Sequence, residues 1–405
     1  MQILAAATDV KDPVLAFDEL DVSLSISDRG PPQILFLVVA AGAEVAGIFA
    51  EARRRYQTTS VHGSTSCLGL MTDSALHLES DRALGALAIW DMQGAYGSAA
   101  SSIGSDPQLS AVEATRAALR NANRLGQVPD LVWMSAAPGH EESSLLGIKS
   151  VLGDRVLIVG GSSADNDLAG AWAQFSQEEL YTEGIVVSVL FSGSKVSSVF
   201  QSGYAPRGPS GLATRCVGRR LFEIDHRPAA EVYYGWLGRD LPKIPANETS
   251  ISILSESTLV PLGMVQHELV DVPLHSLLHP AVMHDDGSIS LFCDVKQGEQ
   301  LYLMEGTSRR LLERAGKIAG QAKADAEARR LEVRGALVVY CGGCMLSVRS
   351  EMELVRKGIA AALPGISFLG LFSYGEQGAT ITGSSHHANL MISCTILTDS
   401  MPIVP

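Results

Sequence analysis

Two cysteines separated by two glycines have a spacing that can do chemistry. Cys341 and Cys344 stand in Cys341-Gly342-Gly343-Cys344, and this spacing can serve a redox dithiol or half of a zinc site. The sequence has no second Cys-x-x-Cys to complete four ligands, and Cys293 and Cys394 could approach only in the folded chain. We therefore favour small thiols that line the end of a strand, and redox activity of the pair stays an open alternative.

Three histidines offer ring nitrogens to a metal or a cofactor. His275 and His279 lie four residues apart, as two ligands on one helix face would, and we expect a helical turn over 274–278 that Pro280 stops. His387 precedes the last apolar run, where a ring nitrogen could bind a haem iron, a metal or a ligand carboxylate. We favour the alternative that His387 holds the strand by bonding a backbone carbonyl. No Cys-x-x-Cys-His is present, which excludes covalently attached c-type haem.

Hydroxyl and carboxylate groups gather directly after apolar runs. One such run is Gly160-Gly161-Ser162-Ser163-Ala164-Asp165. In a ligand site, Asp165 would accept a hydrogen bond from an amine, and Ser162 or Ser163 would donate to a carboxylate. The alternative is a tight turn between two strands that Asp165 and Asn166 cap.

Two further clusters have similar chemistry. Tyr374-Gly375-Glu376 offers a phenol and a carboxylate beside a flexible glycine, and the alternative is an exposed turn with Tyr374 at its rim. Ser64-Thr65-Ser66-Cys67 could hold an activated nucleophile, but nothing in the sequence designates a base for it. The sequence also has no Gly-x-Ser-x-Gly element and no Walker loop. An enzyme that uses the polar strand ends is therefore an alternative without a defined reaction.

The elements that position these residues recur in one order. Three copies of a unit, over 34–90, 112–190 and 311–397, contain an apolar run, a helix pattern, a second apolar run and a closing apolar run. In each copy a strand runs into small, hydroxyl-bearing residues. The closing strand follows a connection without a helix pattern, so we expect antiparallel pairing there. The sequence predicts an α/β fold of layered mixed sheets, built from three related strand-helix-strand units.

The chain divides near residue 205. The segment 201–211 is rich in glycine, proline and serine, which predicts a boundary or hinge. We expect two domains, 1–205 with two units and 206–405 with a central region and the third unit. In the central region, Pro228 suits the start of a helix.

Composition excludes several kinds of partner. Of 405 residues, 46% are hydrophobic and 19% are charged, as in an ordinary globular protein. The formal net charge of −13 argues against nucleic acid or an anionic membrane as a main partner. No apolar run approaches the roughly 20 residues that span a bilayer. Six cysteines in or beside apolar strand patterns indicate reduced thiols and a cytoplasmic protein.

Five segments in order resemble the FIST family of bacterial sensory proteins, whose members have an N-terminal and a C-terminal FIST domain. The resemblance covers nearly the whole chain. The matching segments are 159–165, 223–229 with Tyr233, 341–344, 374–376 and 387–389. The sequence departs from the family at Cys67-Leu68-Gly69-Leu70, which lacks a carboxylate, and at Cys344, where an arginine is frequent. Both changes remove charged groups, which disfavours a charged amino acid as ligand.

The resemblance implies a sensor of a small molecule, with amino acids or their derivatives as proposed ligands. The chain has no kinase, cyclase or DNA-reading signature, so we expect a separately encoded output partner such as a histidine kinase or a cyclic-dinucleotide enzyme. A haem-based nitric-oxide sensor of the same family is an alternative, with His387 and His279 as candidate iron ligands. Strand ends of more than one copy should form the ligand site, with these candidate residues: Ser64, Thr65, Ser162, Ser163, Asp165, Tyr374, Glu376 and Asn389.

Overall fold

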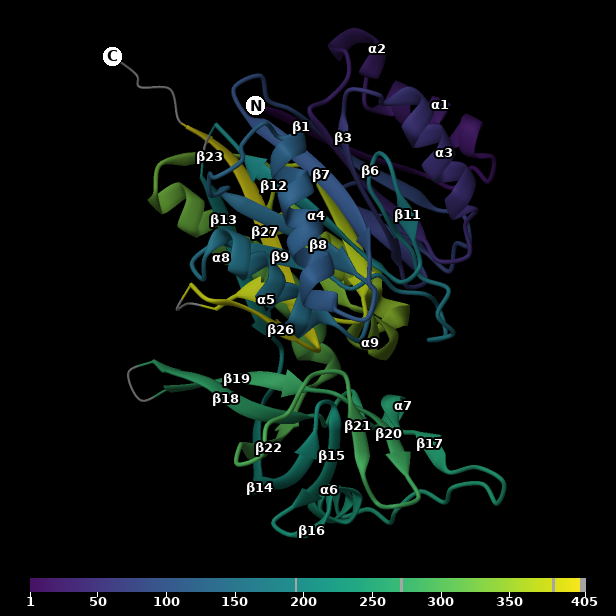
Figure 1. The fold of residues 1–405 in the computed structure, drawn as a ribbon, viewed down its shortest axis with the longest axis vertical. Helices are drawn as coiled ribbons and strands as arrows, with labels where there is room; N and C mark the ends of the chain where they lie inside the picture. Colours follow the sequence, from purple (N-terminus) through teal and green to yellow (C-terminus); the bar gives the residue numbers. More distant parts are fainter. Residues whose placement is uncertain (194, 270–271, 381–382, 401–405) are drawn as a thin grey trace.

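The chain folds into two bodies, which Figure 1 shows one above the other. The structure is a computed structural model that describes residues 1–193, 195–269, 272–380 and 383–400. The larger body, here called the three-sheet body, comprises residues 1–202 and 307–400. The smaller one, here called the central region, comprises residues 205–305. Among the described residues, no helix combines the length and the apolar character needed to cross a membrane.

Three six-stranded sheets form the three-sheet body. The first sheet has the order β1 (Gln2–Thr8), β6 (Leu84–Trp90), β2 (Ile34–Ala40), β3 (Ser60–Ser66), β10 (Gln174–Phe175) and β11 (Leu180–Tyr181). The second has the order β26 (Ser385–Ala388), β25 (Glu376–Ala379), β9 (Ile158–Gly161), β8 (Leu131–Ala136), β12 (Gly184–Phe191) and β7 (Ala95–Ser102). The third has the order β13 (Val196–Ser202), β27 (Met391–Ser400), β23 (Leu331–Cys341), β24 (Phe368–Ser373), β4 (Gly69–Thr72) and β5 (Leu76–Leu78).

The three sheets repeat one pattern of strand directions. A parallel pair lies at the middle of each sheet, and these pairs are β2 with β3, β8 with β9, and β23 with β24. The closing strands β6, β12 and β27 pair antiparallel with the first strand of each pair. The structure therefore confirms the three units, the mixed sheets and the antiparallel closing strands predicted from the sequence.

A hairpin of each unit completes the sheet of another unit. The hairpin β4–β5 follows β3 of the first sheet, but β4 pairs with β24 of the third. The hairpin β10–β11 follows β9 of the second sheet, but β10 pairs with β3 of the first. The hairpin β25–β26 follows β24 of the third sheet, but β25 pairs with β9 of the second. The exchange is cyclic and interlocks the three units.

Helices cover the outer faces of the sheets, and their ends follow from local sequence. They are α1 (Pro13–Ser23), α2 (Ile26–Arg29), α3 (Val45–Arg55), α4 (Pro107–Asn121), α5 (Glu141–Leu152), α8 (Ser308–Ala328), α9 (Gly342–Ser347), α10 (Met352–Ala362) and the 3₁₀ turn η1 (Arg349–Glu351). The carboxylates of Asp12 and Asp106 accept from the backbone N–H three residues on, and a proline follows each of them. Both features favour a helix start.

One apolar core lies between the inner faces of the three sheets. It contains Phe36 of the first sheet, Trp133 of the second and Val339 of the third, and each of these side chains is at most 2% exposed. Separate clusters lie between each sheet and its own helices. Because both faces of β2 are buried, every residue of this strand is apolar.

The central region is an antiparallel sheet with two short helices. Its strands follow the order β17 (Ser250–Ser252), β20 (Pro280–His284), β21 (Ile289–Leu291), β15 (Arg220–Ile224), β14 (Ala205–Val217), β22 (Gln300–Glu305), β18 (Leu262–Leu269) and β19 (Val272–Leu278), with β16 (Arg227–Pro228) beside β15. The helices are α6 (Ala229–Leu237) and α7 (Leu254–Ser257). Pro228 caps α6, next to the helix start that the sequence predicts there.

One local expectation was wrong. The helical turn expected over 274–278 is part of strand β19, which pairs antiparallel with β18, and Pro280 begins strand β20 instead of ending a helix. Prolines on both sides, which we took to delimit a helical turn, here lie within paired strands. Within the segment 201–211, for which the sequence predicts a boundary or hinge, only Gly203 and Tyr204 lie outside strands, because β14 runs from Ala205 through the prolines with an irregular register against β22.

Candidate functional site

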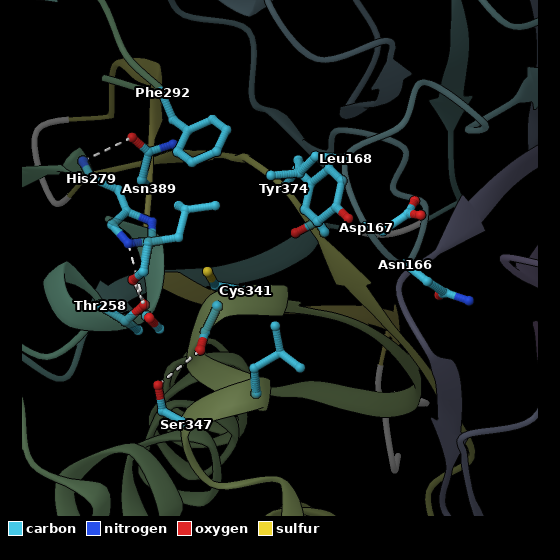
Figure 2. A pocket seen from close by; sticks show the side chains of 15 residues that line it. Asn166, Asp167, Leu168, Thr258, His279, Phe292, Cys341, Ser347, Tyr374 and Asn389 are labelled. Carbon is cyan, nitrogen blue, oxygen red and sulfur yellow. Dashed lines mark hydrogen bonds between the residues drawn. The ribbon is translucent and has the colours of Figure 1, made fainter. Parts of the chain in front are cut away.

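A cavity of about 390 Å³ lies where the two bodies meet. Figure 2 shows side chains of both bodies around it. The three-sheet body contributes Asn166, Asp167, Leu168, Cys341, Gly343, Leu346, Ser347, Ser373, Tyr374 and Asn389. The central region contributes Leu254, Ser255, Thr258, His279 and Phe292. Its volume falls within the range of about 300–1,000 Å³ that is usual for small-molecule pockets.

Asn389 lies in the link between β26 and β27 and holds the two bodies together. Its Oδ1 accepts from the thiol of Cys293 (2.8 Å) and from the backbone N–H of His279 (3.4 Å), both in the central region. Its side chain borders the cavity and is only 2% exposed. Its Nδ2 is buried and has no protein partner. A buried amide donor without a partner is uncommon in folded proteins and indicates an absent partner.

His279 forms the part of the cavity wall that adjoins Asn389. Its Nε2 lies 3.3 Å from Oγ1 of Thr258, and its ring centre lies 5.6 Å from that of Phe292. Burial lowers the pKa of His279 to about 4, although a hydrogen bond to the Leu254 backbone acts in the other direction. The imidazole is therefore neutral near pH 7.

Tyr374 follows β24 and joins the third unit to the second. Its hydroxyl lies 2.7 Å from the backbone oxygen of Asp165 and 2.8 Å from the Oδ1 atom of the same residue. Burial and the neighbouring Cys67 and Asp165 raise the pKa of the phenol. Tyr374 is thus a neutral, fixed side chain in the cavity wall.

Asp165 shapes the loop that borders the cavity without lining the cavity itself. Its carboxylate accepts from the N–H groups of Leu168 (2.7 Å), Gly170 (2.8 Å) and Ala171 (2.9 Å), as well as from Tyr374. Burial raises the pKa of Asp165, but these hydrogen bonds outweigh burial and hold it below its usual value. These contacts are those of a turn cap, which the sequence analysis gave as the alternative to a ligand-binding role for Asp165.

Glu376 and Ser162 lie behind the cavity wall in a buried polar network. Glu376 accepts from Ser373 Oγ (2.7 Å) and from the backbone N–H of Met391 (3.0 Å), and burial raises its pKa well above the usual value. Ser162 donates to Oε1 of Glu141 at 2.6 Å. Neither Glu376 nor Ser162 borders the cavity.

A second bridge between the bodies was missed by the sequence analysis. Arg219 of the central region donates to Glu141 (2.6 Å) and to Glu142 (2.5 Å) at the start of α5. Burial raises the pKa of Glu141, but the charge of Arg219 and the hydrogen bond from Ser162 outweigh it and set the pKa at about 2. Arg219 lies 78 positions from Glu141 and 77 positions from Glu142 in the sequence, and no local pattern predicts such a contact.

The remaining predicted ligand residues lie in the interior of the three-sheet body. Ser64 pairs with Gln174 where the hairpin β10–β11 joins the first sheet. Thr65 accepts from the backbone N–H of Ala173 at 3.0 Å. Ser163 is fully buried beside Ala136, whose carbonyl accepts from its backbone N–H. The structure therefore brings Tyr374, Asn389 and His279 together at the cavity, with Asp165 directly behind, and places the others elsewhere.

The two cysteines of the Cys-x-x-Cys run lie at the end of β23. All six cysteines are free thiols. Cys341 borders the cavity, and burial followed by the neighbouring Cys344 raises its pKa well above the usual value. Cys344 lies 3.6 Å from the hydroxyl of Tyr204. Because a thiolate is the reactive form, this environment disfavours both nucleophilic and metal-binding roles for Cys341.

His387 is the centre of a different cluster, outside the cavity. Its Nδ1 lies 3.2 Å from Gln377 Nε2, and its Nε2 lies 3.3 Å from the backbone oxygen of Phe292. The second contact is the strand-holding bond that the sequence analysis favoured. Ligand atoms of His387, Glu142 and Cys293 lie within 4.8 Å of one another, a set that could hold a metal ion. In this cluster the guanidinium of Arg219 already pairs with the carboxylate of Glu142.

These histidines do not fit a haem group. Both ring nitrogens of His387 contact protein atoms, and His387 does not border the cavity. His279 borders it, but its Nε2 faces Thr258, and its low pKa and position beside Phe292 describe a packed wall residue. Neither imidazole is presented as an axial ligand in a haem-sized pocket.

Apart from His279, sequence reasoning did not find the residues that the central region contributes to the cavity. Phe292, Leu254 and Thr258 lie in central-region segments for which the sequence analysis named no candidate residue. They reach the cavity because the central region folds back on the third unit. One available signal was Asn389, a polar residue between two strands near the end of the chain.

Comparison with known proteins agrees with the ordered segments. A family model of the FIST N domain matches residues 33–227, and one of the FIST C domain matches residues 229–379. No curated protein matches the sequence. A cyanuric acid hydrolase from A. caulinodans is 9% identical with a TM-score of 0.40, over 98% of this chain and 100% of that chain. A chorismatase structure is 9% identical with a TM-score of 0.35, over 98% of both chains. The two family matches cover most of the sequence, and the chain belongs to the FIST family.

Proposed function

We propose that this protein senses a small organic molecule, which binds in the cavity between the three-sheet body and the central region. FIST domains are generally small-ligand sensory domains in signalling. The observation that carries the proposal is Asn389, whose side chain borders the cavity and whose buried Nδ2 has no protein partner. A ligand acceptor placed there removes the cost of that unpaired donor, which is about 1–3 kcal/mol.

The position of the cavity suits a sensor because it links two bodies. Asn389 contacts Cys293 and His279 of the central region, while Tyr374 contacts the loop of the second unit. A ligand that contacts both walls binds one relative placement of the bodies more tightly than another, and so shifts that equilibrium. We propose that the changed surface is recognised by a separately encoded, cytoplasmic effector, such as a histidine kinase or a cyclic-dinucleotide enzyme.

The two alternative functions have less support. An enzyme needs an activated group, and the thiol of Cys341 has a raised pKa, while His279 is already packed against Thr258 and Phe292. A haem sensor needs an axial ligand that neither histidine presents. Protein purified from cells supplied with iron should therefore show no Soret band, and haemin should not restore one. A Soret band that disappears in His279→Ala would contradict this expectation.

A thermal-shift screen with amino acids, nucleobases and small aromatic molecules tests the proposal. A ligand at one hundred times its Kd stabilises the folded protein by about 2.7 kcal/mol. The variant Leu346→Trp adds bulk at the cavity wall and should abolish the shift. Leu354→Trp is the matched control, because the two leucines are 49% and 53% exposed and Leu354 lies on α10 away from the cavity.

The outcomes separate a sensor from the alternatives. A ligand whose stabilisation survives Leu346→Trp binds elsewhere, and the cavity is then not the site. A ligand that is chemically consumed during incubation with wild-type protein, measured by chromatography, supports an enzyme instead. Stabilisation that Leu346→Trp removes, Leu354→Trp preserves, and that leaves the ligand intact is the expected result.

A further inference from the structure

The side chains around the cavity cannot neutralise an anionic ligand. None of the described residues that line it is lysine or arginine. Asp167 is a carboxylate, and the pKa of His279, lowered by burial to about 4, makes that imidazole neutral near pH 7. A carboxylate or phosphate that entered the cavity would lose hydration without gaining a cationic partner, which is unfavourable.

The orientation of the Asn389 amide is fixed by its partners. Both groups that contact Oδ1 are donors, namely the thiol of Cys293 and the backbone N–H of His279. Burial raises the pKa of the Cys293 thiol well above its usual value, so it is protonated and able to donate. The amide oxygen therefore faces the protein, and the buried Nδ2 is left without a protein partner on a residue that borders the cavity. A ligand acceptor at this part of the cavity wall would satisfy that donor.

The rest of the cavity wall favours a flat, apolar ligand. Phe292 and His279 form one side, and Figure 2 shows the Phe292 ring next to the Asn389 amide. Tyr374 adds a third ring, and Leu254 and Leu346 add aliphatic surface. Aromatic rings pack favourably on such surfaces in offset or edge-to-face arrangements. The volume of about 390 Å³ suits a molecule of one or two rings.

We propose that the ligand is an uncharged aromatic or heteroaromatic molecule of one or two rings, whose carbonyl or ring nitrogen accepts from Asn389 Nδ2. This rests on the proposed function, and it narrows the ligand to a class that excludes zwitterionic amino acids. The ring lies against Phe292 and Tyr374, and the acceptor is directed at the Asn389 amide. A carbonyl group meets the need of Asn389 without the desolvation cost of a carboxylate.

Matched probes of equal shape and different charge test the ligand class. Isothermal titration of the wild-type chain with benzamide and benzoate, and with nicotinamide and nicotinate, compares neutral amides with anions of the same size. Phenylalanine serves as the zwitterionic probe. We expect each amide to bind at least about tenfold more tightly than its carboxylate, and phenylalanine to bind no better than benzoate.

The variant Asn389→Asp tests the hydrogen bond. It keeps an oxygen for Cys293 and the His279 N–H, but replaces the unpaired Nδ2 donor by an acceptor. We expect the Kd of benzamide and nicotinamide to rise roughly tenfold or more. Asn166→Asp is the control, because Asn166 also borders the cavity but its amide is already bonded to Ala41 and Leu68. It adds the same charge without removing a free donor, so its effect should be smaller.

Failure of this inference differs from failure of the proposed function. If benzoate or phenylalanine binds as tightly as the amides and Leu346→Trp abolishes that binding, the neutral class is wrong and the cavity remains the site. If the amides bind equally well to Leu346→Trp, the cavity is not the site. If Asn389→Asp and Asn166→Asp weaken benzamide equally, Asn389 does not donate to the ligand. If no amide binds the wild-type chain at millimolar concentration, the proposed class is wrong. Should Asn389→Asp not fold, the wild-type comparison of amide with carboxylate still decides the class.

Discussion

The first and third units end their parallel strands in similar polar residues, yet of these two only the third contributes described residues to the cavity of the candidate site. In the first unit, Ser64 and Thr65 lie at the seam with the exchanged hairpin β10–β11. In the third unit, Tyr374 and Asn389 face the central region, which leaves space between the two bodies. Polar strand ends are thus common to the repeat, while the site depends on what is packed against them.

The largest expected effect concerns the bridge between α5 and the central region. Arg219→Met leaves Glu141 buried without its ion pair, and breaking a buried pair in this way costs about 3–5 kcal/mol. Urea unfolding should show this loss. In the double variant Arg219→Met/Glu141→Gln, much of the stability should return. The exposed pair of Arg215 with Glu223 offers a control, because Arg215→Met should cost about 1 kcal/mol or less. Equal losses in the two single variants would contradict a structural bridge.

A smaller loss should follow from Asp165→Ala. The carboxylate accepts three backbone N–H groups and the Tyr374 hydroxyl, so its removal should cost about 1.5–3 kcal/mol and loosen the loop beside the cavity. Asp167→Ala removes an exposed carboxylate from the same loop and should change stability by about 0.5 kcal/mol or less. Thermal unfolding of both variants measures the difference. If Asp165→Ala is as stable as Asp167→Ala, the loop does not depend on this carboxylate.

Acid should weaken the junction of the two bodies through His279. Its pKa is about 4 in the folded chain and near 6.5 when unfolded, so the unfolded state binds more protons between these values. Stability is therefore fully present above pH 6.5 and is lost as pH falls toward 4, by up to about 1.4 kcal/mol per pH unit. Urea unfolding across this range should show a shallower slope in His279→Gln. An unchanged slope would mean that His279 is already protonated in the folded chain.

The smallest expected effect tests whether the first unit contributes to the ligand site. Thr65→Val removes the acceptor of the Ala173 N–H and should cost about 1 kcal/mol of stability. Ligand affinity should be unchanged, because Thr65 does not border the cavity. Calorimetry with a ligand from the screen measures both quantities in one protein. A tenfold loss of affinity in Thr65→Val would show that the first unit also contributes to the site.

The parts predictable from the sequence were those that depend on neighbours along the chain. Apolar runs, helix caps such as Asp106, and closing strands without a helical connection led to the three units. The exchanged hairpins were not predictable, because β4 pairs with β24 some three hundred residues away. His275 was misplaced for a local reason, since its four-residue spacing from His279 suits a helix although β18 provides a strand partner.

The candidate site was predictable only in part, for the same physical reason. Asn389 and Tyr374 follow or precede strands, so their position at strand ends could be inferred. The role of Asp165 as a loop support depends on three backbone groups that the chain turns toward it. Arg219 and Phe292 enter through the packing of the central region, and nothing in their own segments indicates it.

Because of the cyclic exchange of hairpins, the second sheet cannot be completed until late in synthesis on the ribosome. Strand β9 is translated in the first half of the chain, but its neighbour β25 begins only at Glu376. At elongation rates of about 5–20 residues per second, the emerging second sheet waits roughly 10–40 s with an open edge. Such an edge is a template for pairing with other chains. The nascent protein therefore passes through an aggregation-prone interval that ends only when the third unit leaves the ribosome, and chaperone depletion should lower its yield more than that of a protein whose sheets close in sequence order.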